Sequence, residues 1–334
     1  MKYSFITPVY NTKPSLLKRC IDSIEKLGLE EYELIWVNDG SDNMETNDYC
    51  ASLCESNDHF KYYYQENQGS AVARNQALDM ATGDVVIFVD SDDTIDEGFS
   101  IDEKLCMESD IVFYRYKNVG WNAIDEMPVV NELAFGDISN KKNEIQANIL
   151  YNNNNEFNGY VCGAIWAKTF SRKFIERNHL RFDDELRKTQ DRIFMLDAIA
   201  AAKKIFFSSA VMYDYISNSE SIVHKLNFKI IDYCKAVLLA ADDRIEKYHI
   251  DFKNSKYFRY NIFLEVILLT YCHKECRLSR RDARSGFNEL YKLYNLDPYL
   301  KKLKSSDFLT LKAKAKFWAV KYHMYGLLNY WFTR

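Results

Sequence analysis

Three carboxylates lie within four residues in the segment Asp90-Ser91-Asp92-Asp93, which follows an apolar run at 85–89. Like charges this close together are unfavourable unless a cation or hydrogen-bond donors compensate for them. Mg²⁺ and Mn²⁺ prefer hard oxygen ligands and commonly share them with the phosphates of a substrate. We therefore expect a divalent cation at this position. The alternative is that these acids only cap the helix that follows.

Two further residues are candidates for binding a phosphorylated ligand. Asp39 lies in the turn at 37–41, where its carboxylate would accept a hydrogen bond from a ligand N–H such as the imide of uracil. Its alternative role is turn chemistry alone. Arg74 stands among small residues at 69–75 and would bind phosphate or the acidic cluster. Its alternative role is a structural ion pair.

The elements that must position these residues alternate between strand and helix over about the first 115 residues. The hydrophobic pattern predicts strands at 3–9, 33–37, 60–64, 84–89 and 110–115, and helices at 16–27, 45–55 and 70–81. Such alternation implies parallel strands with helices on both faces of the sheet. Ligands bind beyond the carboxyl ends of these strands. The polar segments 8–11, 38–41 and 90–93 should therefore converge on one rim.

The pattern is less regular in the middle of the chain and becomes helical from Asn227 onward. For the middle we predict a hairpin at 121–131, a loop at 152–155, a strand over Val161–Lys168 and a helix over Asp191–Ala202. We place a soft boundary near residue 225. The expected domains are residues 1–225, with halves at about 1–115 and 116–225, and a helical C-terminal region at 226–334.

Four segments together resemble the family 2 glycosyltransferases of the GT-A fold, especially bacterial polysaccharide-type members. They are TPVYN (7–11), VNDGS (37–41), ENQGSAVARNQAL (66–78) and ATGDVVIFVDSDD (81–93). The four occur in the family's order and at its spacing over about the first 95 residues. The resemblance implies a GT-A-type, Rossmann-like α/β fold. This fold has a mostly parallel sheet flanked by helices, here followed by a helical extension. It also implies a nucleotide-diphosphate-sugar donor, most commonly with uridine.

The resemblance also assigns roles to single residues in the first half. The residues expected to contact the donor are Pro8, Tyr10, Asp39, Arg74, Asp90 and Ser91. The residues expected at a Mn²⁺ or Mg²⁺ ion are Asp92, Asp93 and His224, with Asp92 the direct ligand. His224 follows a segment, 217–223, that resembles the end of the family's catalytic domain. The alternatives for His224 are a pyrophosphate contact or a purely structural role.

The second half carries the expected acceptor side. The segment Gly163–Lys168 resembles one that relatives write as Trp-x-Lys-Leu-Tyr and that forms the floor of the acceptor site. Thr189-Gln190-Asp191 resembles a Glu-Asp pair at the start of a helix, whose aspartate is the catalytic base. Here Gln190 replaces the glutamate, and Asp191 keeps the base position. The alternative for Asp191 is a charge that only favours the helix N-terminus.

Composition limits the cellular setting. The 334 residues carry a net charge of −4, which gives no sign of nucleic-acid binding, and the eight cysteines have no paired framework. No signal peptide or membrane span is evident, so we expect a cytoplasmic protein with reduced thiols. Residues 299–334 hold seven lysines and one arginine against one acid, interleaved with aromatics. This segment is either a docked helix or a contact with the inner face of the membrane.

The sequence therefore predicts an inverting glycosyltransferase that moves a sugar from a UDP-type donor to a hydroxyl acceptor, in cell-surface polysaccharide or glycolipid synthesis. The acceptor would be a saccharide or a lipid-linked saccharide, and the chain could act as an oligomer. One alternative is a nucleotidyltransferase, although the first strand ends in Pro8-Val9-Tyr10-Asn11-Thr12 rather than a glycine-rich basic loop. Another is a non-catalytic module that binds sugar nucleotides.

Overall fold

The computed structural model describes most of the chain, and the remaining residues are left out of the description. The described residues are 1–120, 135–150, 157, 159–217, 225–308 and 310–332. The chain divides into two compact units, Met1–Ser219 and Glu220–Arg334. The boundary predicted near residue 225 differs from this division by a few residues. The hairpin predicted at 121–131 and the loop predicted at 152–155 lie outside the described residues.

The first unit begins with the predicted alternation of strands and helices. Its elements are β1 (Tyr3–Val9), α1 (Pro14–Glu25), β2 (Tyr32–Asp39), α2 (Met44–Ser56), β3 (Phe60–Gln65), α3 (Ser70–Met80), β4 (Val85–Phe88), β5 (Thr94–Ile95), α4 (Glu103–Glu108), β6 (Ile111–Gly120), β7 (Gly136–Asp137), α5 (Lys142–Leu150), β8 (Lys168–Ser171), α6 (Arg172–Arg177), α7 (Gln190–Ala201) and β9 (Ile205–Ser217). The five strands and three helices predicted up to residue 115 are all present. The helix predicted over Asp191–Ala202 is confirmed as α7.

The strands form one sheet in the order β3-β2-β1-β4-β8-β6-β9-β5, with β7 beside β9. The first four strands in this order are parallel, and Ile6 of β1 lies between Ile35 and Phe88. Beyond β4 the sheet is mixed, because β8 runs antiparallel to both β4 and β6. The carboxyl ends of β1, β2 and β4 therefore share one edge. Because β8 runs in the opposite direction, it begins at that same edge.

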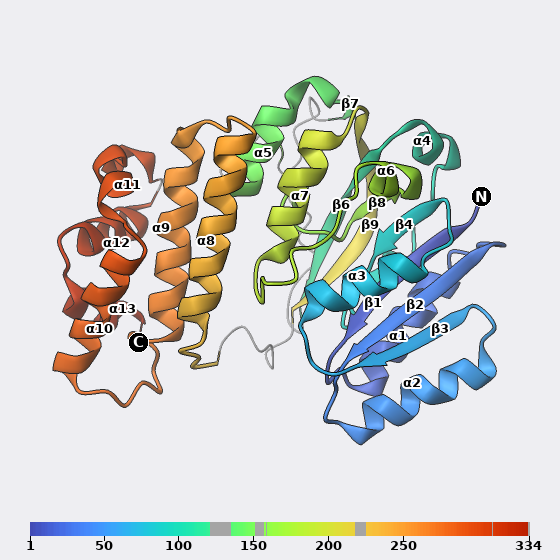
Figure 1. The fold of residues 1–334 in the computed structure, drawn as a ribbon, viewed down its shortest axis with the longest axis horizontal. Coiled ribbons are helices and arrows are strands. Elements are labelled where there is room, and N and C mark those ends of the chain that lie inside the picture. Colours follow the sequence, from blue (N-terminus) through green and yellow to red (C-terminus); the bar gives the residue numbers. More distant parts are fainter. Residues whose placement is uncertain (121–134, 151–156, 158, 218–224, 309, 333–334) are drawn as a thin grey trace. The chain divides into compact units, whose positions relative to one another are not determined.

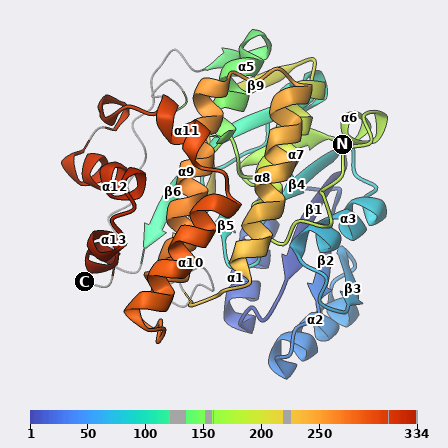
Figure 2. The same cartoon turned by 60° about the vertical axis from the view of Figure 1, so that its left-hand side comes forward.

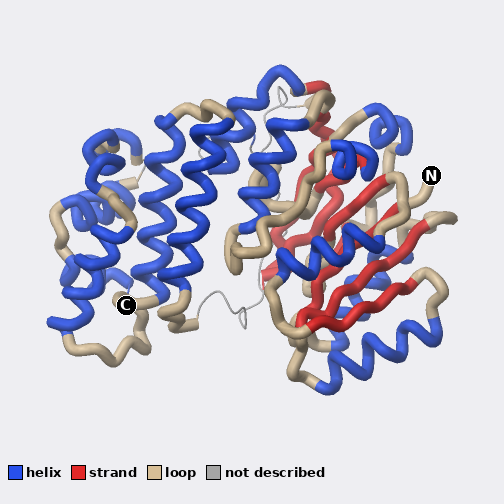
Figure 3. The backbone as a smooth tube through the Cα atoms, viewed as in Figure 1, coloured by secondary structure: helices blue, strands red, loops and turns tan. Residues whose placement is uncertain are grey.

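Helices cover both faces of this sheet (Figures 1 and 3). On one face the apolar side of α1, including Leu17 and Ile21, packs in a core with Phe5 and Trp36 of the central strands. On the other face Phe194 of α7 joins a cluster of phenylalanine rings centred on Phe88. Full burial of an aromatic or aliphatic side chain stabilises a fold by about 1.5–3 kcal/mol. The two apolar layers therefore fix the strand ends on which the site is built.

The strand predicted over Val161–Lys168 is wrong. Residues 162–163 form a turn and residues 164–167 form bends, Ala167 takes a positive φ of 54°, and β8 begins only at Lys168. The buried ammonium of Lys168 donates hydrogen bonds to the carbonyls of Val161 and Trp166, at 2.8 and 3.1 Å. The apolar side chains that resemble a strand pattern are buried because this segment folds around the lysine against the sheet.

The second unit is helical, as the sequence predicted. Its helices are α8 (Ile230–Lys247), α9 (Phe252–Leu269), α10 (Arg280–Leu293), α11 (Asp297–Lys302), α12 (Leu311–Lys321) and α13 (Tyr325–Phe332), seen from a second direction in Figure 2. The ring of Phe263 on α9 packs edge-on against Phe287 and Tyr291 of α10. Among the described residues, no helix is long and apolar enough to span a bilayer.

Candidate active site

Turns at the ends of β1 and β2 hold each other through side-chain hydrogen bonds. The Asn11 side-chain oxygen accepts from the amides of Asp42 and Asn43, at 2.9 and 3.1 Å, and the Asn11 amide donates to Ser41 Oγ at 2.9 Å. Thr12 Oγ1 lies 2.7 Å from Ser91 Oγ, which ties these turns to the acidic segment after β4. The predicted convergence of three polar strand ends on one rim is therefore confirmed.

Asp39 is buried at this rim, and its carboxylate organises the approach to α3. Oδ1 accepts hydrogen bonds from Gln65 Nε2 and the Gln68 amide, both at 2.8 Å, and Oδ2 accepts one from the Gly69 amide at 2.8 Å. Gly69 has a φ of +96°, a conformation that favours glycine. Since the Gly69 amide is its one donor among the described residues, Oδ2 keeps the capacity to accept a further hydrogen bond.

Arg74 joins the donor rim to the predicted catalytic base. Its Nη2 donates to Asp90 Oδ1 at 2.9 Å, and its Nη1 donates to Asp191 Oδ1 at 3.0 Å. Arg74 is 5% exposed, and its guanidinium carbon lies 5.5 Å from the centroid of the Phe182 ring. Two carboxylates that are 101 positions apart in the sequence are thus held by one buried cation. The predicted pairing of Arg74 with the acidic cluster is present. The same contacts also agree with the alternative, a structural ion pair.

Asp93 is locked into the sheet rather than facing the rim. Its carboxylate accepts hydrogen bonds from the Tyr213 hydroxyl at 2.9 Å and the Ile216 amide at 2.8 Å. Burial raises the pKa of Asp93 to about 8, with a further rise from the charge of Asp90. The Asp90 amide donates to the Tyr213 hydroxyl at 3.0 Å. Tyr213 therefore fixes the backbone and side chains of the acidic segment.

Asp92, like Asp90, stays partly accessible, but its carboxylate is not part of the Arg74 bridge. Its carbonyl oxygen accepts from Arg19, and burial together with the nearby Asp90 charge raises the pKa of its carboxyl. Within the described residues, no three Asp, Glu, His or Cys side chains are grouped closely enough to hold a metal ion by themselves. His224 lies outside the described residues. A cation here would have to complete its ligand set with substrate oxygens.

Asp191 opens the first turn of α7. Burial raises the pKa of its carboxyl and the charge of Asp90 adds to the rise, while Arg74, Lys168 and a hydrogen bond from the Ile165 amide oppose it. Burial also lowers the pKa of Lys168 to about 7, and its ammonium lies 4.6 Å from the centroid of the Phe113 ring. A carboxylate with a raised pKa is better suited to accept a proton near neutral pH.

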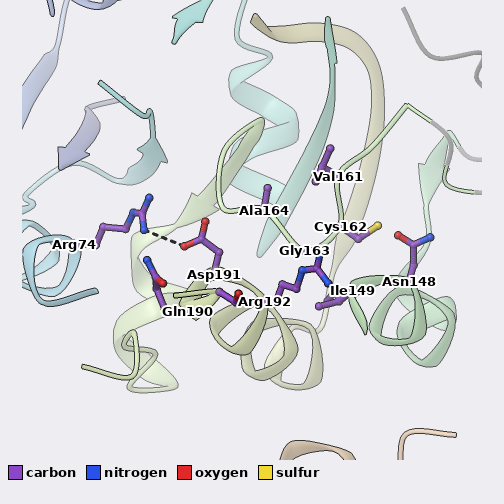
Figure 4. Close-up of a pocket in the computed structure, with 11 residues that line it drawn as sticks. Arg74, Asn148, Ile149, Val161, Cys162, Gly163, Ala164, Gln190, Asp191 and Arg192 are labelled. Atoms are coloured by element: carbon purple, nitrogen blue, oxygen red, sulfur yellow. Dashed lines mark hydrogen bonds and ion pairs between the residues drawn. The ribbon is translucent and has the colours of Figure 1, made fainter. Parts of the chain in front are cut away.

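A pocket of about 300 Å³ adjoins Asp191. Its lining consists of Arg74, Asn148, Ile149, Val161, Cys162, Gly163, Ala164, Thr189, Gln190, Asp191 and Arg192. In Figure 4 Arg74 and Asp191 lie at one end, with Cys162 and Asn148 at the other. The segment resembling an acceptor floor contributes Gly163 and Ala164 to this lining. Four parts of the first unit thus line a space beside the predicted base: Arg74 of α3, the end of α5, the segment at 161–164 and the start of α7.

Gln190, which replaces the family's usual glutamate, also lines the pocket. It is 7% exposed, and its Nε2 donates to Ser70 Oγ at 2.5 Å at the start of α3. Its Oε1 is buried and has no hydrogen-bond partner among the described residues. A buried polar atom without a partner is costly to a fold and calls for an explanation, such as a ligand or an ordered water.

The remaining predicted donor residues lie along the same rim. Pro8 is half-buried near the end of β1, Tyr10 just beyond it is 40% exposed, and Ser91 is buried between Asp90 and Asp92. The exposed ring of Tyr10 has the surface that stacking on a nucleobase requires. Stacking uses the face of the ring and does not require a hydrogen bond from the Tyr10 hydroxyl.

Two positioning residues were not predicted from the sequence. Tyr213 lies in β9, and its ring stacks on Trp166 with centroids 4.7 Å apart. Because its hydroxyl also bonds Asp93, it connects the segment at 161–167 to the acidic segment. Arg187 lies directly over Gly69, where an added Cβ would come within 2.8 Å of its Nη1. Neither residue belongs to a motif. A lone tyrosine in an apolar strand and an arginine in a charged loop have many ordinary explanations.

Comparisons with known proteins decide the family. Residues 4–103 match the model of the family described as glycosyl transferase family 2. The glycosyltransferase GlyG of Streptococcus pneumoniae is 30% identical over 235 residues, which cover 66% of this chain and 72% of GlyG. The chain belongs to glycosyl transferase family 2. The predicted family and enzyme class are thereby confirmed, and the nucleotidyltransferase alternative no longer applies.

Other relatives of this family 2 glycosyltransferase are also bacterial. EpsH of Bacillus subtilis is 27% identical over 263 residues, covering 73% of this chain and 71% of EpsH. A poly(ribitol-phosphate) beta-glucosyltransferase of Bacillus spizizenii is 25% identical over 65% of this chain but only 32% of its own length. The crystal structure of S. aureus TarS 1-349 in complex with UDP-GlcNAc matches with a TM-score of 0.63 at 16% identity. This match covers 98% of the chain and 90% of that structure, and it confirms the predicted fold.

Proposed function

We propose that this chain is an inverting glycosyltransferase that transfers a sugar from a UDP-sugar to a hydroxyl of a saccharide or lipid-linked saccharide acceptor. One observation carries the proposal: Arg74 bonds both Asp90 on the donor rim and Asp191 beside the pocket. The bridge holds a carboxylate that can accept a proton next to the place where a donor would lie. Positioning two substrates in one cleft supplies much of the rate enhancement of a bimolecular reaction.

On the donor side, Asp39 would accept a hydrogen bond from the uracil imide through Oδ2, with the Tyr10 ring against the base. Support comes from the buried, amide-bound geometry of Asp39 and the exposure of Tyr10. The TarS structure that shares this fold is a complex with UDP-GlcNAc. Ser91, which bonds Thr12, and Arg187, which lies beside Gly69, would face the diphosphate and the sugar.

On the acceptor side, the pocket beside Asp191 would hold the acceptor sugar. Asp191 takes the proton of the acceptor hydroxyl, and that oxygen attacks the anomeric carbon of the donor sugar. The bond from this carbon to the diphosphate breaks, and UDP leaves with the electron pair. A single displacement of this kind inverts the anomeric configuration. The unpartnered Gln190 Oε1 would accept a hydrogen bond from another acceptor hydroxyl.

The residues at the rim fit a cation that is shared with the substrate. Asp90 is paired with Arg74 and Asp93 with Tyr213, so Asp92 would be the carboxylate that binds Mn²⁺ or Mg²⁺. When bound, such an ion neutralises the charge that develops on the departing diphosphate. We expect Asp92→Asn to weaken UDP binding in the presence of Mn²⁺ but to leave metal-free binding unchanged. Calorimetric titration that finds equal Mn²⁺ dependence in both proteins would remove this assignment.

We further propose that the reaction takes place in the cytoplasm and contributes to cell-surface polysaccharide or glycolipid synthesis. All eight cysteines are free thiols, and six of them are buried, which fits a reducing compartment. A relative named for a poly(ribitol-phosphate) acceptor supports a polymeric or surface acceptor. An oligomeric state would be compatible with this role and is open to measurement by light scattering.

A donor screen tests the proposal. The full chain is incubated with a panel of UDP-sugars and with GDP- and dTDP-sugars, each with Mn²⁺ or with EDTA, and nucleotide release is measured. The proposal expects release of UDP from one UDP-sugar, faster with a saccharide acceptor present. The Asp191→Asn protein should release UDP no faster than a sample without protein. Turnover of only GDP- or dTDP-sugars would contradict the assigned nucleotide.

A further inference from the structure

Helix α12 of the second unit presents an apolar stripe to solvent. Leu311, Ala315, Trp318 and Tyr322 recur at spacings of four, three and four residues, which places them on one face of a helix with 3.6 residues per turn. Leu311 is 83% exposed, Trp318 39% and Tyr322 62%. The rings of Trp318 and Tyr322 stack with centroids 5.4 Å apart and planes 3° apart. The stripe is therefore an ordered aromatic surface.

The opposite face of α12 anchors the helix to its own unit. Phe317 and Val320 are fully buried, and the Phe317 ring stacks on Phe308 at 5.1 Å and packs against Tyr260 at 6.3 Å. Because Phe317 and Val320 already pack into the core of their own unit, that core does not need the exposed stripe. Its orientation outward is set by the packing of the unit.

Lysines flank the stripe on both sides, and the helix carries no acid. Its charged residues are Lys312, Lys314, Lys316 and Lys321. At 100° per residue, Lys314 and Lys321 lie along one side of the stripe and Lys312 along the other. Lys316 lies further round the helix, with its Nζ 4.5 Å from the centroid of the Phe332 ring. Lys321 Nζ lies 5.5 Å from the Trp318 ring centroid.

Within the described part of the chain, no ion pair neutralises these lysines. Asp307, which precedes the helix, is paired with Lys256. Partial burial lowers the pKa of Lys316, and the like charge of Lys312 adds to the fall. The helix surface therefore carries uncompensated positive charge beside exposed aromatic rings.

We propose that α12 docks on an anionic lipid surface, with Leu311, Trp318 and Tyr322 in the headgroup boundary and Lys312, Lys314 and Lys321 against the phosphates. Interfacial helices combine such an apolar stripe with flanking lysines. Trp and Tyr are enriched where a protein meets the membrane interface. A symmetric contact between two copies would bring the lysines of both helices together, so charge favours lipid over self-association. The proposal does not depend on the donor or on Asp191.

Vesicle co-sedimentation of the full chain tests this directly. Wild-type protein should bind vesicles of phosphatidylcholine with phosphatidylglycerol, bind vesicles of phosphatidylcholine alone weakly, and lose binding as salt is raised. The variant L311S/W318S should lose most binding to the anionic vesicles. The variant K312Q/K314Q should bind them roughly 25-fold less tightly, since each lysine near such a surface contributes about 1 kcal/mol, or roughly fivefold.

The matched control K104Q/K173Q changes two exposed lysines of the first unit and alters the net charge equally. It should bind the anionic vesicles as wild type does. Thermal unfolding midpoints and UDP titration of each variant show that it is folded, and a protein that binds vesicles but no UDP would refute only the proposed function. Equal binding to both vesicle types, or α12 variants that bind as wild type does, would overturn lipid docking. Self-association that the α12 variants abolish without lipid would assign the stripe to a second copy instead.

Discussion

The proposed donor rim and the proposed acceptor pocket of this glycosyltransferase are built in different ways. At the rim, Asn11, Ser41 and Asp39 are held by backbone amides and neighbouring side chains from turns that follow adjacent parallel strands. At the pocket, Gln190 keeps a buried oxygen without a partner, and Asp191 depends on a cation from another helix. The rim is held by hydrogen bonds between turns at the strand ends, whereas the pocket leaves the Gln190 oxygen to a ligand.

This difference separates the expected consequences of mutation. Changes at the rim should act on donor affinity, because that surface is organised before the acceptor arrives. Changes at the pocket should act on turnover, because the base and the acceptor contacts are made there. Arg74 contacts residues of both regions, so its substitution should change both donor affinity and turnover.

The largest effect is expected from Asp191→Asn. An amide cannot take the acceptor proton, and general-base catalysis typically contributes about 10²–10⁴-fold, so transfer should fall roughly a thousandfold. UDP affinity should stay within a few-fold of wild type because the rim is untouched. Steady-state kinetics and calorimetry on the same preparation measure both values. Asp282→Asn, which changes an acid in the first turn of α10, is the matched control and should leave transfer unchanged.

Arg74→Gln should give the largest loss of stability. It leaves Asp90 and Asp191 without their shared cation, and breaking a buried ion pair costs about 3–5 kcal/mol. The free energy of unfolding should fall by about 3 kcal/mol, at the low end of this range, because the two carboxylates are partly exposed. Urea unfolding measures it. Arg181→Gln breaks an exposed pair with Asp79 and should cost less than about 1 kcal/mol; equal losses in the two variants would refute a special role for Arg74.

Asp39→Asn should weaken UDP binding and leave the turnover of bound donor nearly unchanged. Hydrogen bonds to charged groups contribute about 1.5–3 kcal/mol, so the dissociation constant should rise roughly tenfold or more. The comparison variant is Asp42→Asn, which changes an exposed acid two positions after Gly40. If both variants bind UDP as tightly as wild type, the donor does not meet Asp39.

The smallest effect is a pH dependence of stability at Lys168. Its pKa is about 7 in the fold and near its ordinary, higher value when unfolded, so the unfolded chain binds more protons between these values. The free energy of unfolding is therefore highest at high pH and decreases as the pH falls toward 7, by on the order of 1 kcal/mol per pH unit. Lys168→Met should flatten this slope in urea unfolding between pH 7 and 9. Lys173→Met, at an exposed lysine, should keep it.

The same contrast explains what the sequence could predict. The parallel half of the sheet and the rim follow from hydrophobic periodicity and from polar turns such as Asn38–Ser41, which are local signals. Asp191 was placed by resemblance, and the structure adds the Arg74 bridge that no local pattern contains. The segment at 161–167 resembles a strand because burial around Lys168 gives the same apolar composition. Tyr213 was missed because its hydrogen bond to Asp93 joins residues 120 positions apart.

The proposed reaction is a single displacement at the anomeric carbon with Asp191 as the base. Nuclear magnetic resonance of the first product formed from the selected UDP-sugar, read at the anomeric proton before any equilibration, tests this mechanism most directly. A single displacement gives a new glycosidic bond with the anomeric configuration opposite to that of the donor. A product that retains the donor configuration would contradict it.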